Sequence, residues 1–194
     1  GDYLEFGVFN GTSMLCMHRA LKKLGISSVR MFGFDSFEGL PTITHSGDTV
    51  LHWHSGQFKS TLPDTKRNLD QGGVDWKKVF LIKGWYDKTL NNTLIQKHHI
   101  ANASIIMIDC DLYSSTKTAL NFCRPLINKE AIILFDDWDS GENLAEKNVG
   151  EKKAFDEFLH DNPHFSAEEF GSYYHTELEG TPESKIFLVK RNRT

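Results

Sequence analysis

Seven short apolar runs recur along the chain, and segments with helical spacing of apolar residues separate most of them. Each run is rich in β-branched or aromatic residues and stops at polar residues or glycine, as strands buried in a sheet do. We expect strands over residues 3–8, 29–34, 79–83, 104–108, 131–135, 165–170 and 185–189. Strands that alternate with helices predict an α/β fold with a mostly parallel sheet, and the last two runs predict an antiparallel hairpin at its edge.

Apolar residues at helical spacing predict helices over residues 12–24, 64–69, 89–98 and 151–159. A further helix is expected to begin at Ser114 or Ser115 as its N-cap and to end near Cys123. The connection over residues 36–77 is long and rich in turns and aromatic residues, so we expect it to be ordered and to form a wall over the active site. Polar loops are expected around Gly141 and Gly150 and around Gly180 and Pro182.

Two of the predicted strands end in aspartates. Asp109 and Asp111 follow the run over residues 104–108, and Asp136 and Asp137 follow the run over residues 131–135. Ligands of open parallel α/β sheets bind outside the carboxyl ends of the strands, so neighbouring strands would bring four carboxylates to one rim. Because carboxylates this close raise one another's pKa unless a cation neutralises them, we infer a hard divalent cation, Mg²⁺ or another, held by oxygen ligands. Capping of the following helices is the alternative role for these aspartates.

The first predicted strand leads into a glycine-containing turn, from Gly7 to Gly11, whose free amides could approach a ligand. Such glycines can also serve the backbone alone, and their spacing departs from the Gly-x-Gly-x-x-Gly dinucleotide fingerprint. Asp35 ends the second strand, where α/β nucleotide binders hold ribose hydroxyls. A cap is the alternative role for Asp35, but the glycine turn favours cofactor binding. Trp85, just past the third strand, either flanks an adenine ring or belongs to the core.

Composition narrows the class of protein. The 194 residues, 39% of them hydrophobic, fit one globular domain. Twenty-two basic residues against 26 acidic residues, with no basic run, argue against a nucleic-acid partner. No apolar run approaches the roughly 18–20 residues needed to cross a bilayer, and the first residues do not resemble a signal peptide. The three cysteines, Cys16, Cys110 and Cys123, lack metal-type spacing, so we expect buried thiols in a reduced, cytoplasmic protein.

Five motifs follow one another along nearly the whole chain. They are Glu5-Phe6-Gly7-Val8-x-x-Gly11, Asp35-Ser36-Phe37-x-Gly39-Leu40-Pro41, Lys83-Gly84-Trp85, Asp109-x-Asp111-Leu112-Tyr113-x-Ser115-Thr116 and Asp136-Asp137. In this order they resemble the macrocin O-methyltransferase (TylF-like) family of class I S-adenosylmethionine-dependent enzymes. The resemblance implies a Rossmann-like, mostly parallel seven-stranded sheet with helices on both faces and a C-terminal antiparallel strand. It also implies magnesium-dependent methylation of sugar hydroxyls, the activity of members that act on macrolide and aminocoumarin antibiotics.

The resemblance implies roles for individual residues. Asp109, Asp136 and Asp137 would ligate the metal, and Asp111 would be the general base. The cofactor would be held by Glu5, Gly7, Val8, Gly11, Thr12, Asp35, Ser36, Gly84, Trp85 and Asp109. Its methionine part would lie at the glycine turn and its ribose at Asp35 and Ser36. Two adjacent hydroxyls would chelate a cation better than one, so we expect a sugar or another vicinal diol as the methyl acceptor.

We therefore expect one S-adenosylmethionine-dependent methyltransferase domain over residues 1–194, without the N-terminal cap helices that family members generally carry. The expected partner is a small hydroxylated molecule and neither nucleic acid nor a membrane; homo-oligomer formation is left open. A truncated or non-catalytic cofactor-binding module is one alternative, because the chain begins almost inside a strand. A nucleotide-dependent oxidoreductase is another, which the missing third glycine disfavours. Substrate specificity is expected to lie in residues 42–58, in residues 138–148 and in any segment that precedes Gly1.

Overall fold

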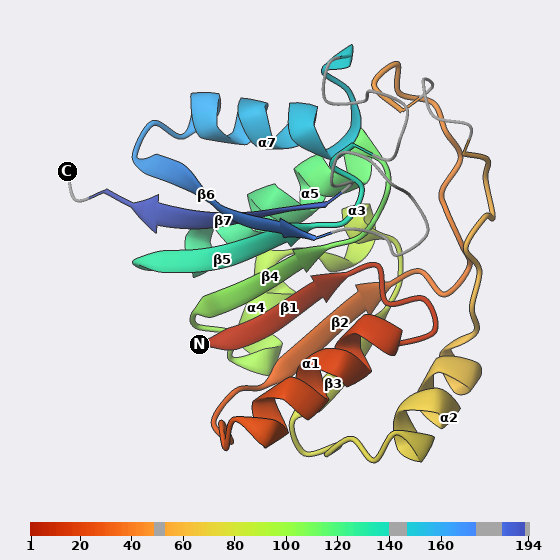
Figure 1. Ribbon diagram of the computed structural model, residues 1–194. Helices are drawn as coiled ribbons and strands as arrows, with labels where there is room; N and C mark the ends of the chain where they lie inside the picture. The colour runs from red at the N-terminus through yellow and green to blue at the C-terminus, as the bar shows by residue number, and fades with distance from the viewer. Residues whose placement is uncertain (49–52, 140–146, 174–183, 193–194) are drawn as a thin grey trace.

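The computed structural model describes residues 1–48, 53–139, 147–173 and 184–192, and a seven-stranded sheet forms the centre of this part of the chain (Figure 1). The strands are β1 (Asp2–Phe6), β2 (Met31–Asp35), β3 (Val79–Lys83), β4 (Ala103–Ile108), β5 (Glu130–Phe135), β6 (Phe165–Tyr173) and β7 (Ser184–Arg191). They lie in the order β3-β2-β1-β4-β5-β7-β6. The pairings from β3 to β5 are parallel, and β7 is antiparallel to both β5 and β6. The strand order reverses between β1 and β4, the place where open α/β sheets bind ligands.

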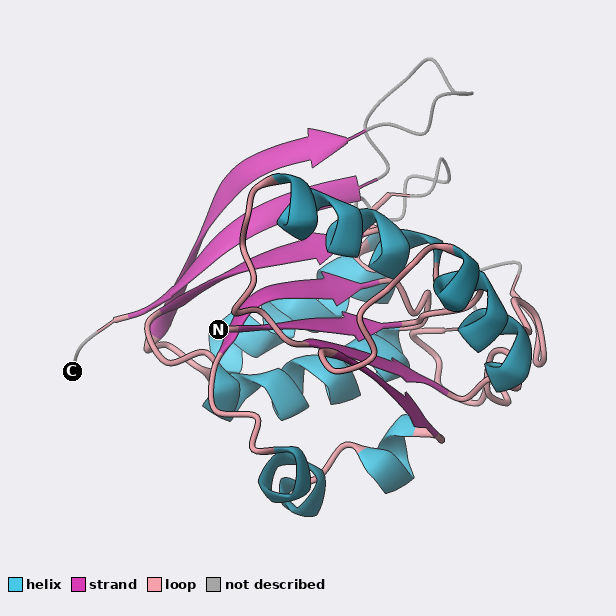
Figure 2. Ribbon diagram, turned by 90° about the horizontal axis from the view of Figure 1, so that it is seen from below, coloured by secondary structure: helices cyan, strands magenta, loops and turns pink. Residues whose placement is uncertain are grey.

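Helices cover both faces of the sheet (Figures 1 and 2). One face carries α1 (Thr12–Lys23) and α2 (Leu62–Gln71), and the other carries α4 (Asn92–His98), α5 (Tyr113–Cys123) and α7 (Gly150–Asp161). Two short elements, α3 (Tyr86–Thr89) and η1 (Arg124–Leu126), complete the described helices. Alternate side chains of a strand point to opposite faces, so Leu4 and Phe6 join the core with α5 and α7, while Tyr3 packs with Met14 of α1.

The predicted sheet, mostly parallel with an antiparallel end, is confirmed, but several boundaries differ. β1 ends at Phe6 and not at Val8, because the chain turns at Gly7 with a φ of 92°. The helix expected over residues 89–98 is present as α4 but begins three residues later, at Asn92, because the separate short helix α3 ends at Thr89. The side chain of Asn91 starts α4 by accepting the N–H of Leu94 at 3.0 Å. The loop residues Gly141, Gly180 and Pro182 lie outside the described residues.

The predicted cap of α5 by Ser114 or Ser115 is also wrong. The N-cap is Leu112, whose side chain makes no capping bond. Asp48 from the β2–α2 connection is buried and accepts the N–H of Ser114 through Oδ1 at 3.1 Å. Among the cysteines, Cys110 and Cys123 are buried as expected. Cys16 is exposed, because the buried residues of α1, Met14 and Leu21, lie on a different side of the helix.

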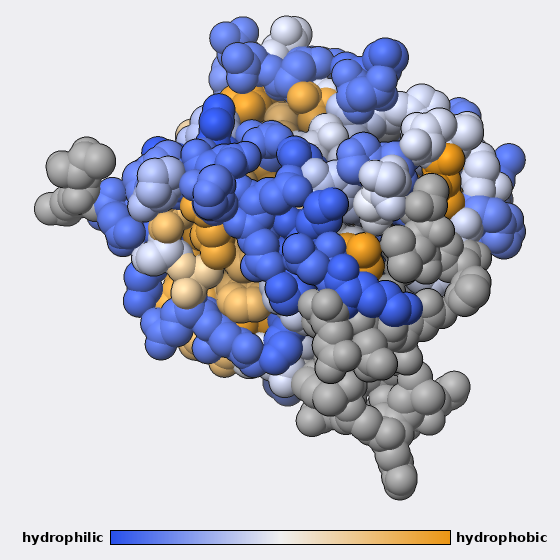
Figure 3. Space-filling model, turned by 90° about the horizontal axis from the view of Figure 1, so that it is seen from above, coloured by the Kyte–Doolittle hydropathy of each residue, from blue (hydrophilic) through white to orange (hydrophobic). Residues whose placement is uncertain are grey.

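The surface above α7 is mostly polar. In Figure 3, hydrophilic side chains (blue) cover most of the face seen from above, and hydrophobic ones (orange) show in smaller areas. This agrees with α7, which buries Phe155 and Phe158 while Lys152 and Asp156 form an ion pair of 2.6 Å at its surface. No helix in the described part of the chain is both long and apolar enough to span a membrane.

Candidate functional site

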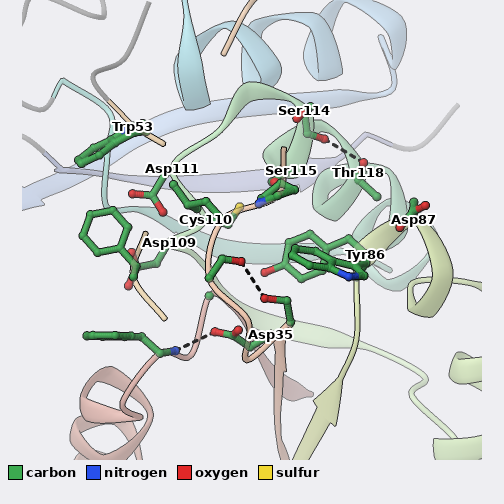
Figure 4. Close-up of a pocket in the computed structure, with 18 of the residues that line it drawn as sticks. Asp35, Trp53, Tyr86, Asp87, Asp109, Cys110, Asp111, Ser114, Ser115 and Thr118 are labelled. Carbon is green, nitrogen blue, oxygen red and sulfur yellow. Dashed lines mark hydrogen bonds between the residues drawn. The ribbon is translucent and has the colours of Figure 1, made fainter. Parts of the chain in front are cut away.

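A cavity of about 790 Å³ lies at the carboxyl ends of the parallel strands, beside the reversal between β1 and β4. Figure 4 shows Asp35, Asp109 and Asp111 around this cavity, with Trp53 to the left and Tyr86 to the right. The predicted site residues that line it are Gly7, Asp35, Ser36, Gly84, Trp85, Asp109, Asp111, Asp136 and Asp137. A cavity of this volume suits a small-molecule ligand.

The turn after β1 brings two strand ends together below the cavity. Gly7 has a φ of 92°, and a Cβ atom at this position would lie 1.6 Å from the backbone oxygen of Asp109. Only glycine therefore permits this approach of the two strand ends. Gly7 lines the cavity, whereas the other predicted cofactor-binding residues of the turn, Val8, Gly11 and Thr12, do not.

The carboxylate of Asp35 holds this turn in place. Its Oδ2 accepts the N–H groups of Val8 and Phe9 at 2.8 Å each, and its Oδ1 accepts the N–H of Phe37 at 2.6 Å. The capping role considered as an alternative is thus present. An ionised carboxylate has about four acceptor sites, so Asp35 could still accept a ligand hydroxyl in the cavity that it lines. Its ribose-binding role stays a prediction.

Glu5 lies beneath the turn and does not line the cavity. Its buried carboxyl accepts hydrogen bonds from Tyr3 Oη at 2.5 Å and from Ser13 Oγ at 2.7 Å. Burial raises the pKa of Glu5 from 4.5 to about 7, although these two hydrogen bonds oppose the shift. The structure thus gives Glu5 a role in joining β1 to the first turn of α1, and its contact with a cofactor stays a prediction.

Asp109, Asp136 and Asp137 come together at the ends of β4 and β5. One carboxylate oxygen from each lies within 4.8 Å of the others, and all three residues are half-buried. Burial, and then the charges of Asp136 and Asp137, raise the pKa of Asp109 well above its ordinary value. Three hard anionic oxygens in a partly desolvated site fit a divalent cation such as Mg²⁺.

Asp111 lies outside this three-oxygen cluster but lines the same cavity. Its backbone is left-handed, with a φ of 61°, and the N–H of Leu112 bonds to the Cys110 oxygen across it at 2.6 Å. Such strained conformations cluster at functional sites. Burial, and then the charges of Asp136 and Asp35, raise the pKa of Asp111 to about 7. A carboxyl group in this environment is suited to general-base chemistry near neutral pH.

A fifth carboxyl group lies behind the cluster and was not singled out in the sequence. Glu151 of α7 is fully buried, and its Oε2 accepts the N–H of Asp137 at 3.0 Å. Among the described residues its Oε1 has no hydrogen-bond partner. Burial, and then Asp137, raise the pKa of Glu151 well above its ordinary value. The sequence does carry a signal for the burial of Glu151, because its spacing places it on the same helical face as the buried residues Ala154, Phe155 and Phe158.

The end of β3 forms the opposite wall. The N–H of Gly84 donates to the backbone oxygen of Asp35 at 2.9 Å, and Trp85 begins α3 as its N-cap. Trp85 lines the cavity and is only half-buried, which favours the ring-flanking role over a place in the core. Tyr86, also absent from the predicted site, lines the same wall and donates its hydroxyl to the Phe34 oxygen at 3.2 Å.

Relatives of known description are similar to this chain in sequence. The family described as macrocin-O-methyltransferase (TylF) matches residues 1–162. The 8-demethyl-8-(2,3-dimethoxy-alpha-L-rhamnosyl)-tetracenomycin-C 4'-O-methyltransferase of Streptomyces olivaceus is 30% identical over 143 residues, which cover 71% of this chain and 53% of that protein. The mycinamicin III 3''-O-methyltransferase of Micromonospora griseorubida is 25% identical, with 71% and 55% covered. The chain thus spans about half the length of the curated relatives it matches.

Solved structures agree with the fold. The O-methyltransferase NovP gives a TM-score of 0.77 at 21% identity and covers 100% of this chain and 72% of its own. A calicheamicin methyltransferase gives a TM-score of 0.68 at 20% identity, with 96% and 71% covered. The predicted class I methyltransferase fold is confirmed by these likenesses. Because the family match covers far more than half of the residues, the chain belongs to the macrocin O-methyltransferase (TylF) family.

Proposed function

We propose that this chain forms the catalytic domain of an S-adenosylmethionine- and divalent-metal-dependent O-methyltransferase that acts on a sugar hydroxyl of a glycosylated natural product. The proposal rests mainly on the arrangement of the carboxylates, three of which form a cluster suited to a metal ion while a fourth lies apart from it in the same cavity. Asp109, Asp136 and Asp137 offer three oxygens within 4.8 Å, while Asp111 lines the same cavity outside that cluster. Curated relatives described as methyltransferases of rhamnosyl-tetracenomycin and mycinamicin support the substrate class.

The proposed reaction assigns one task to each group. When bound, S-adenosylmethionine would supply the electrophilic methyl group, and a cation held by Asp109, Asp136 and Asp137 would lower the pKa of the acceptor hydroxyl. Asp111 takes the hydroxyl proton as the new oxygen–carbon bond forms and the sulfur–carbon bond breaks. The rigid strand ends hold the reacting groups in line.

The cofactor is proposed to lie across the β1–β4 reversal. Gly7, Asp35, Ser36, Gly84 and Trp85 line the cavity there and would contact it directly. Glu5, Val8, Gly11 and Thr12, which lie in the strand end, the turn and the helix start around it, would act indirectly by supporting that turn. This arrangement keeps the cofactor site and the metal site next to each other, with Asp109 shared between them and the other residues distinct.

Calorimetric titration tests these two sites separately. We expect S-adenosylmethionine to bind the wild-type chain, to bind Asp136→Ala with similar affinity in the absence of metal, and to bind Asp35→Ala at least about tenfold more weakly. Mg²⁺ binding should show the reverse pattern, lost in Asp136→Ala and kept in Asp35→Ala. Thermal unfolding checks that each variant is folded, since Asp35 also holds the glycine turn. A folded wild-type chain that binds no S-adenosylmethionine would contradict the proposal.

A further inference from the structure

Three aromatic rings border the cavity on the side of Trp53 (Figure 4). Phe9, Trp53 and Phe58 all line it, and we call them the aromatic wall. The Phe58 ring meets Trp53 edge-on with centroids 5.1 Å apart and meets Phe9 edge-on at 6.5 Å. Phe9 and Phe58 are 41% and 42% exposed. Large apolar side chains that are exposed inside a cavity favour an apolar ligand there.

Two residues of the aromatic wall have unfavourable backbone conformations. Phe9 has a φ of 47° and Phe58 a φ of 55°, values that bulky residues rarely adopt. Such conformations persist where the surroundings enforce them, and they cluster at ligand sites. Two hydrogen bonds hold the Phe9 backbone in this conformation. Its N–H donates to Asp35, and its backbone oxygen accepts the Thr65 hydroxyl at 2.5 Å.

The turn that carries Phe58 is fixed to the segment around Leu40, in the same connection between β2 and α2. The N–H of Leu40 donates to the Gln57 oxygen, and the Leu40 oxygen accepts the N–H of Gly56, both at 2.9 Å. Gly39 lies so close that a Cβ atom there would stand 2.5 Å from the Gly56 oxygen. Phe9 and Phe58 of the aromatic wall are therefore held by the protein's own backbone contacts, so a ligand would not have to order these two residues on binding.

Charge narrows the class of ligand. The charged residues that line the cavity in the described part of the chain are six aspartates and Lys88, which pairs with Asp87 at 2.8 Å. Even with a cation held by Asp109, Asp136 and Asp137, the described lining residues offer no unpaired basic side chain that could bind a phosphate, which disfavours nucleotide sugars as acceptors. An uncharged ligand with a flat apolar part fits this surface.

We propose that the aromatic wall binds the planar, apolar aglycone of an uncharged glycoside, so that a hydroxyl of its sugar reaches the carboxylates at the cavity floor. This inference rests on the proposed function for the reacting hydroxyl and adds the chemistry of the part that does not react. Stacking between aromatic rings contributes roughly three- to tenfold in affinity for each ring contact.

Fluorescence titration with methylumbelliferyl β-D-glucopyranoside tests the proposal, in the presence of S-adenosylhomocysteine and Mg²⁺. Methyl β-D-glucopyranoside, which lacks the flat aglycone, and the anionic UDP-glucose serve as competitors. We expect the aryl glucoside to bind at least about tenfold more tightly than either competitor. Phe9→Leu and Phe58→Leu should each weaken it roughly three- to tenfold and leave the methyl glucoside unchanged.

A matched substitution controls for the loss of a phenyl ring. Phe170 of β6 is 67% exposed and does not line the cavity, so Phe170→Leu should leave all three affinities unchanged. The proposal is overturned if the aryl glucoside binds no more tightly than the methyl glucoside, if UDP-glucose binds best, or if both wall variants keep the wild-type affinity. Calorimetric binding of S-adenosylhomocysteine to every variant separates this failure from failure of the proposed function, which would abolish that binding in the wild-type chain.

Discussion

At the scale of a single residue, the buried carboxyl of Glu5 should make stability depend on pH. Its pKa is raised from 4.5 to about 7 in the folded chain, so the folded state binds a proton that the unfolded state releases between these values. The stability it contributes is fully present below pH 4.5 and is lost as the pH rises to about 7. The loss amounts to about 3 kcal/mol for a shift of this size.

Glu5→Gln keeps the shape of the side chain and removes this titration. We expect the free energy of unfolding of the variant, minus that of the wild type, to rise by up to about 3 kcal/mol between pH 4.5 and pH 7.5. Urea unfolding measures it, and the subtraction cancels the other titrating acids. Glu157→Gln is the control of opposite sign. Lys117 lowers the pKa of Glu157, so the wild type loses the stability from this group as the pH drops below 4.5, and the difference between this variant and the wild type should change only in that range. A flat difference for Glu5→Gln would contradict the assignment.

Gly7 shows how one missing side chain sets the distance between two strand ends. Gly7→Ala would place a methyl group 1.6 Å from the Asp109 oxygen and keep a positive φ, so we expect a loss of more than about 3 kcal/mol in the free energy of unfolding. Gly25→Ala is the matched control, since Gly25 also has a positive φ of 68° but no atom within 4 Å of the added methyl. The control should lose only about 1 kcal/mol in the same urea experiment. Equal losses in the two variants would show that contact with Asp109 is unimportant.

At the scale of elements, the start of α5 is fixed by a distant residue. Asp48 is buried and accepts the Ser114 N–H, and Gly47 beside it packs against Tyr113. A carboxylate at a helix N-terminus also interacts favourably with the helix dipole. We expect Asp48→Ala to lower the free energy of unfolding by about 1–2 kcal/mol and Tm by roughly 3–6 °C.

Asp48→Asn is the matched control, because an asparagine side chain can still accept the Ser114 N–H. It should stay within about 0.5 kcal/mol of the wild type in the same thermal unfolding experiment. If Asp48→Ala unfolded at the wild-type temperature, the cap would contribute nothing to stability.

The two helix starts that sequence reasoning missed differ in how visible they were. Asn91 is a preferred N-cap residue and the third residue of the helix expected over residues 89–98, so a local signal marks the true start of α4. Asp48 caps Ser114 from 66 positions away in the sequence, and no local pattern reveals such a partner. Local structure signals thus predict an element where its cap is local, and they fail where tertiary contacts supply the cap.

At the scale of the whole molecule, the same distinction separates what could be predicted from what could not. Buried strands give continuous apolar runs, so the sheet and the meeting of Asp109 with Asp136 and Asp137 followed from the sequence. The buried Glu151 and the aromatic wall depend on how loops and helices pack over the sheet, and strand patterns do not encode that packing. The roles proposed for the cofactor-binding residues stay predictions.

The cluster of Asp109, Asp136 and Asp137 predicts that a divalent cation stabilises the whole domain. Without a cation, burial and mutual repulsion disfavour the charged carboxylates, whereas an ion that binds only the folded state removes this repulsion. At about 100 times its Kd, Mg²⁺ should add about 2.7 kcal/mol to the free energy of unfolding and raise Tm by roughly 5–10 °C. Thermal unfolding with Mg²⁺ or with a chelator measures this shift.

The variants should separate the two effects, repulsion and metal binding. Asp136→Asn removes one of the repelling charges, so it should unfold at or above the wild-type temperature in chelator, yet gain nothing from Mg²⁺. Asp156→Asn, at an aspartate of α7 that does not line the cavity, should keep the full Mg²⁺-dependent shift. A wild-type Tm that is the same in Mg²⁺ and in chelator would argue against a metal site, because binding to the folded state alone must raise Tm. The opposite responses of Asp136→Asn in the two conditions cannot arise from a general loss of packing, which would lower Tm in both.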